Sequence, residues 1–398
     1  MNTQTMPAPH STAEAADIEP FNIAISPYII EDLRERLGRA RWPDEIEDSG
    51  WQYGANLEYL RHLCTHWAHG FDWKEQEDQL NALHHYRTTV DGFGLHFIHE
   101  RGADSASAAS AASIPILLLH GWPDSFARFL KVIPLLTAKS PDGLSFDVVV
   151  PSIPGFGFSD KPMKAGMGIP RIAELFAGLM KKLGYQRYLV HGGDWGSSIA
   201  EAMAMRFPDR IRGLHLTDVP YGNRNRSEVP DMTEAEKDYF RRGQQWLMQD
   251  GAYGLLQSTK PQTLAYAVND SPIGLAAWII DKFYAWTDHP GNLEQVYTRD
   301  ELLVNLTIYW ITQTSGSSFR LYYETMHSPQ KLPQERIDIP TAICIAPKDM
   351  VNAPREYAER LFTIRQWTEL PVGGHFLAME RPALLAADIF VFAGKLNH

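Results

Sequence analysis

Hydrophobic residues in the N-terminal quarter of the chain follow a helical period. Leu33 and Leu37 share one face of a first segment, and apolar positions recur at helical spacing over residues 57–68 and 73–83. No residue in this region has the spacing of a catalytic or metal site, so we expect a helical packing domain. Residues 1–20 are rich in Ala, Pro, Ser and Thr and lack any period, which predicts a mobile tail.

The pattern changes to strands after residue 85. Two strand-like runs flank Asp91 and Gly92 within residues 87–100, which predicts a β-hairpin. Five further runs are short and almost continuously hydrophobic, at residues 114–121, 146–155, 187–194, 211–219 and 341–349. Helical patterns near residues 125–138, 170–184 and 196–206 separate the first four. Buried strands that alternate with helices indicate an α/β fold with a parallel sheet covered on both faces.

Residues 221–337 break this alternation. The segment is charged, aromatic and mostly helical in pattern, and residues 271–286 are its clearest apolar-periodic part. Asp194 and Asp349, which end two of the predicted strands, are 349 − 194 = 155 residues apart. Connections of ~2–6 residues would not fill this distance. We therefore expect one helical lid above the carboxyl ends of the sheet, where such folds bind ligands.

Composition and charge exclude several classes of function. Of the 398 residues, 44% are hydrophobic and 21% are charged, the balance of an ordinary globular protein. The net charge of −11 would repel phosphates, so we expect no nucleic-acid partner. No stretch approaches the ~20 apolar residues of a membrane-spanning helix. Only two cysteines, Cys64 and Cys344, occur. We expect a soluble, cytoplasmic protein without a membrane anchor, a disulfide framework, a cofactor or a metal.

One glycine-rich turn carries the strongest chemical signal. In GGDWG, residues 192–196, an apolar strand ends and a helix rich in Ala and Met follows. The turn resembles the strand-to-helix elbow of α/β-hydrolases, in which small residues flank an exposed nucleophile, with Asp194 where serine is usual. The helix N-terminus would favour a carboxylate or an oxyanion there. An inert N-capping aspartate beside two turn glycines fits the same residues.

Three further motifs favour the catalytic interpretation. HGWP, residues 120–123, follows a strand where α/β-hydrolases place the loop that supplies an oxyanion-hole N–H. PGFGFSD, residues 154–160, follows the next strand. His375 comes after two glycines, and Asp349 closes a strand 375 − 349 = 26 residues earlier. Nucleophile, acid and histidine thus follow the chain order expected for α/β-hydrolases.

Together these motifs resemble the epoxide hydrolases of the microsomal type, including their juvenile-hormone and fungal relatives, over residues from about 20 to 395. Besides the elbow and the HGWP loop, the matching segments are residues 39–45, 51–63, 71–81 and 91–100 in the N-terminal part, 250–264, 270–283 and 319–324 in the predicted lid, and 373–382 near the C-terminus. The resemblance implies an α/β-hydrolase fold with a mostly parallel central sheet, a helical lid insertion and an N-terminal helical extension. The membrane anchor of some animal members is missing from the pattern.

The resemblance also implies the organisation of the chain and its partners. The expected parts are a tail at 1–20, an epoxide-hydrolase-type N-terminal domain at 21–100, a first core part at 101–220, a helical lid at 221–337 and a second core part at 338–398. The implied partners are water and a small apolar or aryl epoxide, and no cofactor is implied. A homodimer is compatible with this organisation.

The residue types suit the opening of an epoxide. A carboxylate that attacks saturated carbon forms an ester whose carbonyl lies on the enzyme, where water then hydrolyses it. A phenol, with a pKa near 10, stays protonated at neutral pH yet donates to a more basic alkoxide. The resemblance assigns the ring-opening tyrosines to Tyr253 and Tyr322. Tyr323, about 100° away around a helix, is the alternative to Tyr322.

The remaining roles follow from the same motifs. We expect Asp194 to be the nucleophile, His375 to be the general base that activates water, and Asp349 to orient His375. The backbone N–H groups of Trp122 and Trp195 are expected to form the oxyanion hole, the second because it directly follows the nucleophile.

Two other functions fit parts of the pattern. A haloalkane dehalogenase also uses an elbow aspartate followed by tryptophan, and Trp195 would then hold the halide. The matched lid tyrosines and the N-terminal helical domain argue against it. A non-catalytic ligand-binding relative would use an aromatic cavity as a receptor pocket. Such a protein has no chemical need for Asp194, Asp349 and His375 together.

Overall fold

The first residues that the structure describes join the central sheet. The structure, a computed structural model, describes residues 17–103, 113–219, 229–328 and 335–396. Residues 1–16 of the expected tail lie outside the described residues. Glu19 and Pro20, which the sequence assigned to that tail, instead form a short strand and pair with Arg87 and Tyr86.

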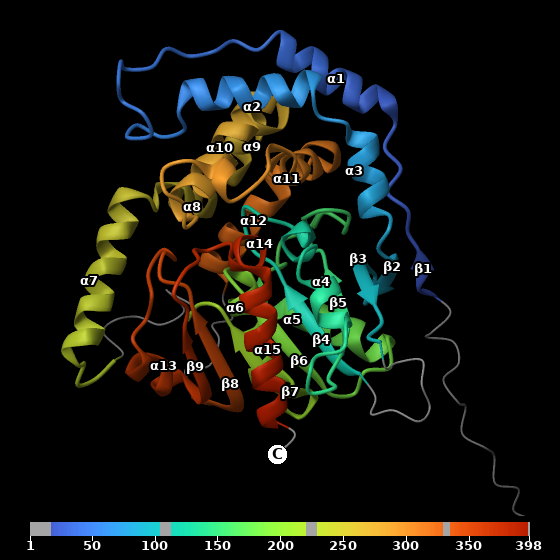
Figure 1. Cartoon of the computed structure of the whole chain (residues 1–398), viewed down its shortest axis with the longest axis vertical. Coiled ribbons are helices and arrows are strands. Elements are labelled where there is room, and N and C mark those ends of the chain that lie inside the picture. The colour runs from blue at the N-terminus through green and yellow to red at the C-terminus, as the bar shows by residue number, and fades with distance from the viewer. Residues whose placement is uncertain (1–16, 104–112, 220–228, 329–334, 397–398) are drawn as a thin grey trace, which may run out of the picture.

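A mixed sheet forms the centre of the molecule (Figure 1). In the described residues it has nine strands in the order β1-β2-β3-β5-β4-β6-β7-β8-β9, antiparallel from β1 to β5 and parallel from β5 to β9. Their bounds are Glu19–Pro20, His85–Val90, Phe93–Glu100, Ile114–Leu119, Phe146–Pro151, Tyr188–Gly192, Ile211–Leu216, Ile337–Ile345 and Phe362–Glu369, from β1 to β9. The fold is therefore α/β with a mostly parallel sheet, as the sequence predicted.

The parallel strands are the ones with continuous apolar runs. β4 to β8 coincide with the five predicted runs, and β2 and β3 form the predicted hairpin around Asp91 and Gly92, both at positive φ. The sequence analysis did not expect β1 and β9. β1 has only two residues, and in β9 only Phe362 and Gln366 are buried because this strand lies at the edge of the sheet.

Helices cover both faces of the sheet. α5 and α6 pack together on one face, and α4 and α15 on the other. These core helices are α4 (Ile133–Thr137), α5 (Ile169–Lys182), α6 (Trp195–Arg206), α13 (Arg355–Leu361), α14 (Leu377–Glu380) and α15 (Pro382–Leu396), with short 3₁₀ turns at Phe126–Phe129 and Pro208–Arg210.

Between β7 and β8 the described residues form six helices, which lie above the carboxyl ends of the parallel strands (Figure 1). They are α7 (Glu234–Gln249), α8 (Ala252–Thr259), α9 (Pro261–Asp270), α10 (Pro272–Trp286), α11 (Arg299–Thr312) and α12 (Ser315–His327), with a 3₁₀ turn at Leu293–Gln295. Local sequence explains where several begin. α7 and α11 start with capping boxes, and α9 and α10 carry proline in their first turn. No strand occurs in the described stretch 229–328.

The N-terminal helices lie across the lid. They are α1 (Pro27–Gly38), α2 (Leu57–His69) and α3 (Trp73–Leu80), and Figure 1 shows α1 and α2 over α9 and α10. Trp67 Nε1 donates to Thr307 Oγ1 in α11 at 2.9 Å, and the ring of Trp51 stacks on Tyr284 with centroids 3.8 Å apart. The extension therefore braces the lid from outside. None of the helices described is long and apolar enough to cross a bilayer.

The buried contact between Trp67 and Thr307 makes a testable contribution to this brace. Trp67→Phe keeps an aromatic ring but leaves the Thr307 hydroxyl without its indole donor, so we expect the free energy of unfolding to fall by about 1–2 kcal/mol. The double variant Trp67→Phe/Thr307→Val removes both partners and should recover part of that loss. Urea denaturation followed by circular dichroism measures both. A double variant no more stable than the single one would contradict a role for this hydrogen bond.

Candidate active site

Asp194 sits on a strained turn between β6 and α6. Its φ of 57° lies in the left-handed region, which is uncommon for a residue with a side chain and typical of functional turns. A methyl group on Gly192 would meet the backbone of Gly196, and one on Gly196 would meet the Leu119 carbonyl of β4. The small residues are therefore required by close backbone contacts. Because the Asp194 side chain makes no capping hydrogen bond to α6, the inert N-cap interpretation fails.

Two loops surround the Asp194 carboxylate with donors. The Trp122 backbone N–H, from the HGWP loop after β4, donates to Asp194 Oδ1 at 2.8 Å. The Trp195 backbone N–H, the first of α6, lowers the pKa of Asp194 and so also favours the ionised carboxylate. His375 Nε2 lies 3.6 Å from Asp194 Oδ2. The structure thus brings both predicted oxyanion-hole amides and the predicted base to the predicted nucleophile.

His375 is held from three directions. Its Nδ1 lies 2.8 Å from Asp349 Oδ1, which also accepts the Met350 backbone N–H at 2.7 Å. Its backbone N–H donates to the Trp286 carbonyl at the end of α10, and its carbonyl accepts from Arg128 Nη2 at 2.7 Å. The ring is 2% exposed. Asp349 and Asp194 therefore lie at opposite ring nitrogens of His375.

Burial and neighbouring charges set the protonation of these groups. Burial raises the pKa of Asp194, against the charge of His375 and the amides of Trp122 and Trp195, which lower it. Burial alone would lower the pKa of His375, but Asp349 and then Asp194 raise it to about 9. Burial works to raise the pKa of Asp349, and His375 outweighs it, so that pKa is lowered. These shifts favour a protonated His375 beside an ionised Asp349 at neutral pH.

Two lid tyrosines face this carboxylate. Tyr253 in α8 and Tyr322 in α12 are each 8% exposed, and their rings lie 6.1 Å apart. The ring of Tyr322 packs edge-on against Trp195 at 4.7 Å, and Tyr253 stacks on Trp122 at 5.1 Å. Burial, followed by nearby groups that include the Asp194 charge, raises the pKa of both phenols well above 10. Both stay protonated near Asp194.

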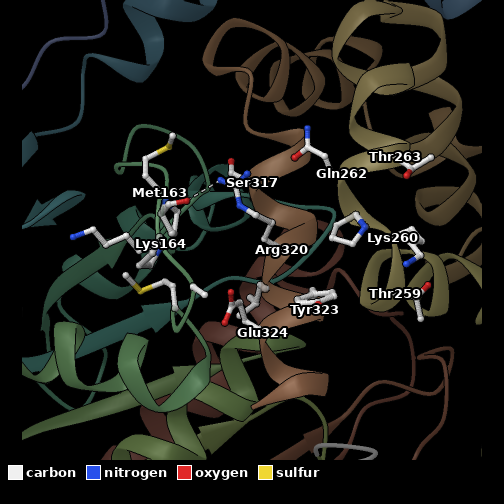
Figure 2. A pocket seen from close by; sticks show the side chains of 16 residues that line it. Met163, Lys164, Thr259, Lys260, Gln262, Thr263, Ser317, Arg320, Tyr323 and Glu324 are labelled. Carbon is white, nitrogen blue, oxygen red and sulfur yellow. Dashed lines mark hydrogen bonds between the residues drawn. The ribbon is translucent and has the colours of Figure 1, made fainter. Parts of the chain in front are cut away.

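The neighbouring tyrosine points elsewhere. Tyr323 is 40% exposed, stacks on His327 and lines a separate cavity on the far side of α12. Figure 2 shows it there beside Arg320. Helical geometry thus resolves the choice that the sequence left open, and it turns Tyr322 toward Asp194.

A cavity of about 720 Å³ joins these groups. It lies between the carboxyl ends of the strands and the helices α7, α8 and α12. Asp194, Tyr253, Tyr322 and Asp349 contribute to its wall. Most of the other lining side chains are apolar: Trp195, Val219, Trp246, Leu247, Met248, Leu255, Met326, Met350 and Val351. The volume falls in the range of ordinary small-molecule sites.

Four buried polar atoms beside Asp194 have no hydrogen-bond partner among the residues described. They are Tyr322 Oη, His375 Nε2 and the indole nitrogens of Trp122 and Trp195. Such orphaned groups are rare in folded proteins and call for a local reason. Because these atoms surround one carboxylate and one cavity, they are available to form hydrogen bonds with a polar group of a bound ligand. The described residues contain no group of three or more His, Cys, Asp or Glu arranged to hold a metal ion.

The sequence analysis missed a third carboxylate in the site. Asp218 follows β7 and lines the same cavity, and its Oδ1 accepts the Asp194 backbone N–H at 2.9 Å and Ser197 Oγ at 2.5 Å. Burial, then the charge of Asp349, raises its pKa to about 7. The signal was present, because Asp218 ends a predicted strand at the same edge of the sheet as Asp194 and Asp349.

A buried ion pair behind the site also escaped the sequence analysis. Arg128 is 2% exposed and pairs with Asp124, while Asp124 Oδ1 accepts the Gly121 N–H at 2.8 Å. Because Arg128 also holds the His375 carbonyl, it connects the oxyanion loop to the histidine loop. The sequence pattern does not reveal this pair, because both residues follow a loop motif and Arg128 contacts a residue far away in the sequence.

Comparison with known proteins gives the family. The model of the family "Epoxide hydrolase N terminus" matches residues 18–129, and that of the family "alpha/beta hydrolase fold" matches residues 114–382. Epoxide hydrolase 1 of Sus scrofa is 36% identical over 414 residues, covering 97% of this chain and 91% of the relative.

Solved structures agree with this assignment. The crystal structure of juvenile hormone epoxide hydrolase from the silkworm Bombyx mori superposes with a TM-score of 0.84 at 32% identity, covering 96% of this chain and 94% of that one. The epoxide hydrolase of Aspergillus niger superposes with a TM-score of 0.82 at 27% identity, covering 96% and 97%. The elbow aspartate, the two lid tyrosines and these matches lead to one conclusion. The chain belongs to the epoxide hydrolases that combine an α/β-hydrolase core with the epoxide-hydrolase N-terminal domain.

Proposed function

We propose that this enzyme opens an epoxide to a vicinal diol through a covalent ester on Asp194. The observation that carries the proposal is the placement of two buried, protonated phenols, Tyr253 and Tyr322, in the same cavity wall as the Asp194 carboxylate, which is 12% exposed. A ring-opening reaction needs a nucleophile for carbon and an acid for oxygen in one dry site.

The first half-reaction uses the resting charges. The Asp194 carboxylate attacks a ring carbon, the carbon–oxygen bond breaks, and one tyrosine gives its proton to the departing oxygen. The second tyrosine donates a hydrogen bond to the same oxygen. The imidazolium of His375, with its pKa of about 9, supplies the proton that restores the tyrosinate. After this step His375 is neutral and Asp194 is a neutral ester.

The second half-reaction depends on that loss of charge. The Asp194 carboxylate is one of the groups that raise the pKa of His375, so its conversion to an ester lowers that pKa and favours the neutral base. His375, oriented by Asp349, takes a proton from water, and the hydroxide attacks the ester carbonyl. The Trp122 and Trp195 amides stabilise the oxyanion that forms. Collapse releases the diol and returns the ion pair.

The lining supports an apolar or aryl epoxide as substrate. Trp246, Leu247, Met248, Met326 and Val351 provide contact surface without charge, so burial of apolar substrate surface supplies binding energy. The polar groups gather at the floor of the cavity around Asp194. An epoxide would therefore turn its ring toward the elbow and its apolar substituent toward the lid.

The lid tyrosines also separate this proposal from its rivals. A haloalkane dehalogenase expels halide, which needs no proton, so two phenols beside the nucleophile would have no task. A non-catalytic receptor has no use for a strained aspartate held by two amides and a histidine. The family match with epoxide hydrolases supports the same choice.

Removing the base should trap the ester. General-base assistance contributes on the order of 10²–10⁴-fold, so His375→Gln should alkylate and then hydrolyse very slowly. We expect mass spectrometry after incubation with styrene oxide to find one substrate mass on the peptide 187–205. Asp194→Ala is the control and should gain no mass. A His375→Gln enzyme that turns over normally, or never gains mass, would contradict the mechanism.

The two tyrosines should control formation of that ester. Tyr253→Phe and Tyr322→Phe should each slow alkylation by roughly 10- to 10²-fold, because one phenol remains to assist the ring oxygen. Rapid-quench mass spectrometry of the elbow peptide measures this step. Tyr323→Phe is the matched control, since its ring faces the other side of α12, and it should alkylate at the native rate. Equal slowing in all three variants would point to a structural effect.

The pKa of His375 should follow the charge of Asp194. Asp194→Asn copies the neutral ester, so the pKa of His375, about 9 in the free enzyme, should fall. From the electrostatics of charges 3.6 Å apart we expect a fall of at least about one unit. NMR titration of the imidazole measures it, with the exposed, distant Asp160→Asn as control. Because hydrolysis needs neutral His375, its single-turnover rate should rise with pH through this lower pKa. An unchanged pKa of His375 would contradict the proposed coupling between the charges of Asp194 and His375.

A further inference from the structure

A second cavity lies on the opposite side of α12 from Tyr322. It measures about 440 Å³ and is walled by the core segment after β5, the start of α9 and the outer face of α12. Figure 2 shows Arg320 in its centre, with Met163 and Lys164 on one side and Lys260 and Gln262 on the other. It shares no lining residue with the reaction cavity.

Three cations line this cavity in an otherwise acidic protein. Lys164, Lys260 and Arg320 come from three different elements, and none has a carboxylate within ion-pair distance in the part of the chain that the structure describes. The carboxylate of Glu324, also in the wall, is directed to the Gly166 backbone N–H at 2.8 Å. The three cations thus stand without an ion-pair partner among the described residues although the chain as a whole has a net charge of −11.

Arg320 is the half-buried member of this group, whereas Lys164 and Lys260 are exposed. Its Nη2 donates to the Pro162 carbonyl at 3.1 Å, while its Nε is buried without an acceptor among the described residues. Burial lowers the pKa of Arg320, with Glu324 acting weakly in the other direction. Lys161, on the adjoining segment, also has a lowered pKa because of burial and the charge of Arg320. An anion in the cavity would relieve this concentration of positive charge.

The backbone adds to the positive electrostatic potential of the cavity. The ten-residue helix α9 begins at Pro261, and residues 259–263 form one wall of the cavity, so the positive end of the helix dipole faces it. Thr259, Gln262 and Thr263 supply neutral hydrogen-bonding groups there. The helix end thus reinforces a site already defined by Arg320.

The remaining wall is apolar. Met163, Met167, Leu321 and the ring of Tyr323 line the space around the cations. A bare inorganic ion would leave this surface uncovered, whereas an anion with a short apolar body would fill it. We propose that this cavity binds an organic anion whose carboxylate or phosphate head meets Arg320, Lys164 and Lys260 and whose apolar body covers the methionines and Tyr323.

Such a ligand would join the lid to the core. Lys164 belongs to the segment between β5 and α5, whereas Lys260 joins the lid helices α8 and α9 and Arg320 lies in α12. One head group that contacts all three would tie these parts together next to the helix that carries Tyr322. This site lies beyond the proposed function, because it uses none of the reacting residues.

Calorimetric titration with octyl phosphate and with octanoate tests the proposal and distinguishes a phosphate from a carboxylate head. We expect sub-millimolar binding of at least one in 0.15 M NaCl. The double variant Lys164→Gln/Lys260→Gln, which changes only exposed side chains, should bind at least about tenfold more weakly, and so should Arg320→Gln. Lys181→Gln, an exposed lysine of α5 outside the cavity, is the matched control and should bind as the native enzyme does.

Further measurements decide where the anion sits. Binding of the anion should weaken in 0.5 M NaCl because salt screens the lysine charges. Octanol, which has no charged head group, is the neutral control, and the double variant should not weaken any binding of it. A native affinity in the double variant and in Arg320→Gln, or no binding of either anion at millimolar concentration, would overturn the proposal. Competitive inhibition of epoxide turnover that the variants leave unchanged would place the anion in the reaction cavity and would also overturn it.

Discussion

The charge of Asp194 is the interaction on which the site depends. Removing a carboxylate from water costs several kcal/mol unless donors and opposite charge replace the solvent. Here the Trp122 and Trp195 amides and the His375 imidazolium supply that replacement. Each compensating group later acts in the proposed reaction, as oxyanion donor or as base. The features that make the buried nucleophile tolerable thus prepare both chemical steps.

The cost of burying charge also explains two residues that take no direct part in the proposed reaction, Asp218 and Arg128. Three carboxylates, Asp194, Asp218 and Asp349, meet at the end of the sheet, and they cannot all be ionised cheaply. Asp218, with its pKa raised to about 7, relieves the excess by holding a proton near neutral pH while its Oδ1 fixes the Asp194 N–H. Behind them the buried Arg128 adds a permanent positive charge that favours ionised Asp349 and opposes protonation of His375.

Most of the core was predictable because its signals are local. The five apolar runs gave β4 to β8, and strand-end position together with chain order singled out Asp194, Asp349 and His375. Chemical type alone did not separate Tyr322 from Tyr323, because that choice depends on how α12 is rotated against the core. Arg128 and Asp124 were missed because their partners are set by tertiary contacts, and the Trp67–Thr307 contact joins residues 240 positions apart.

The end of α10 ties the lid to His375, the proposed base. The His375 N–H donates to the Trp286 carbonyl, so the end of α10 cannot move without moving the base. The N-terminal helices brace the same half of the lid through Tyr284 and Thr307. By contrast, Met248 and Leu255, from α7 and α8, line the reaction cavity and are 88% and 62% exposed. The α7–α8 side is therefore the solvent-exposed part of the cavity wall, whereas the α10 end of the lid is joined to His375 by a hydrogen bond.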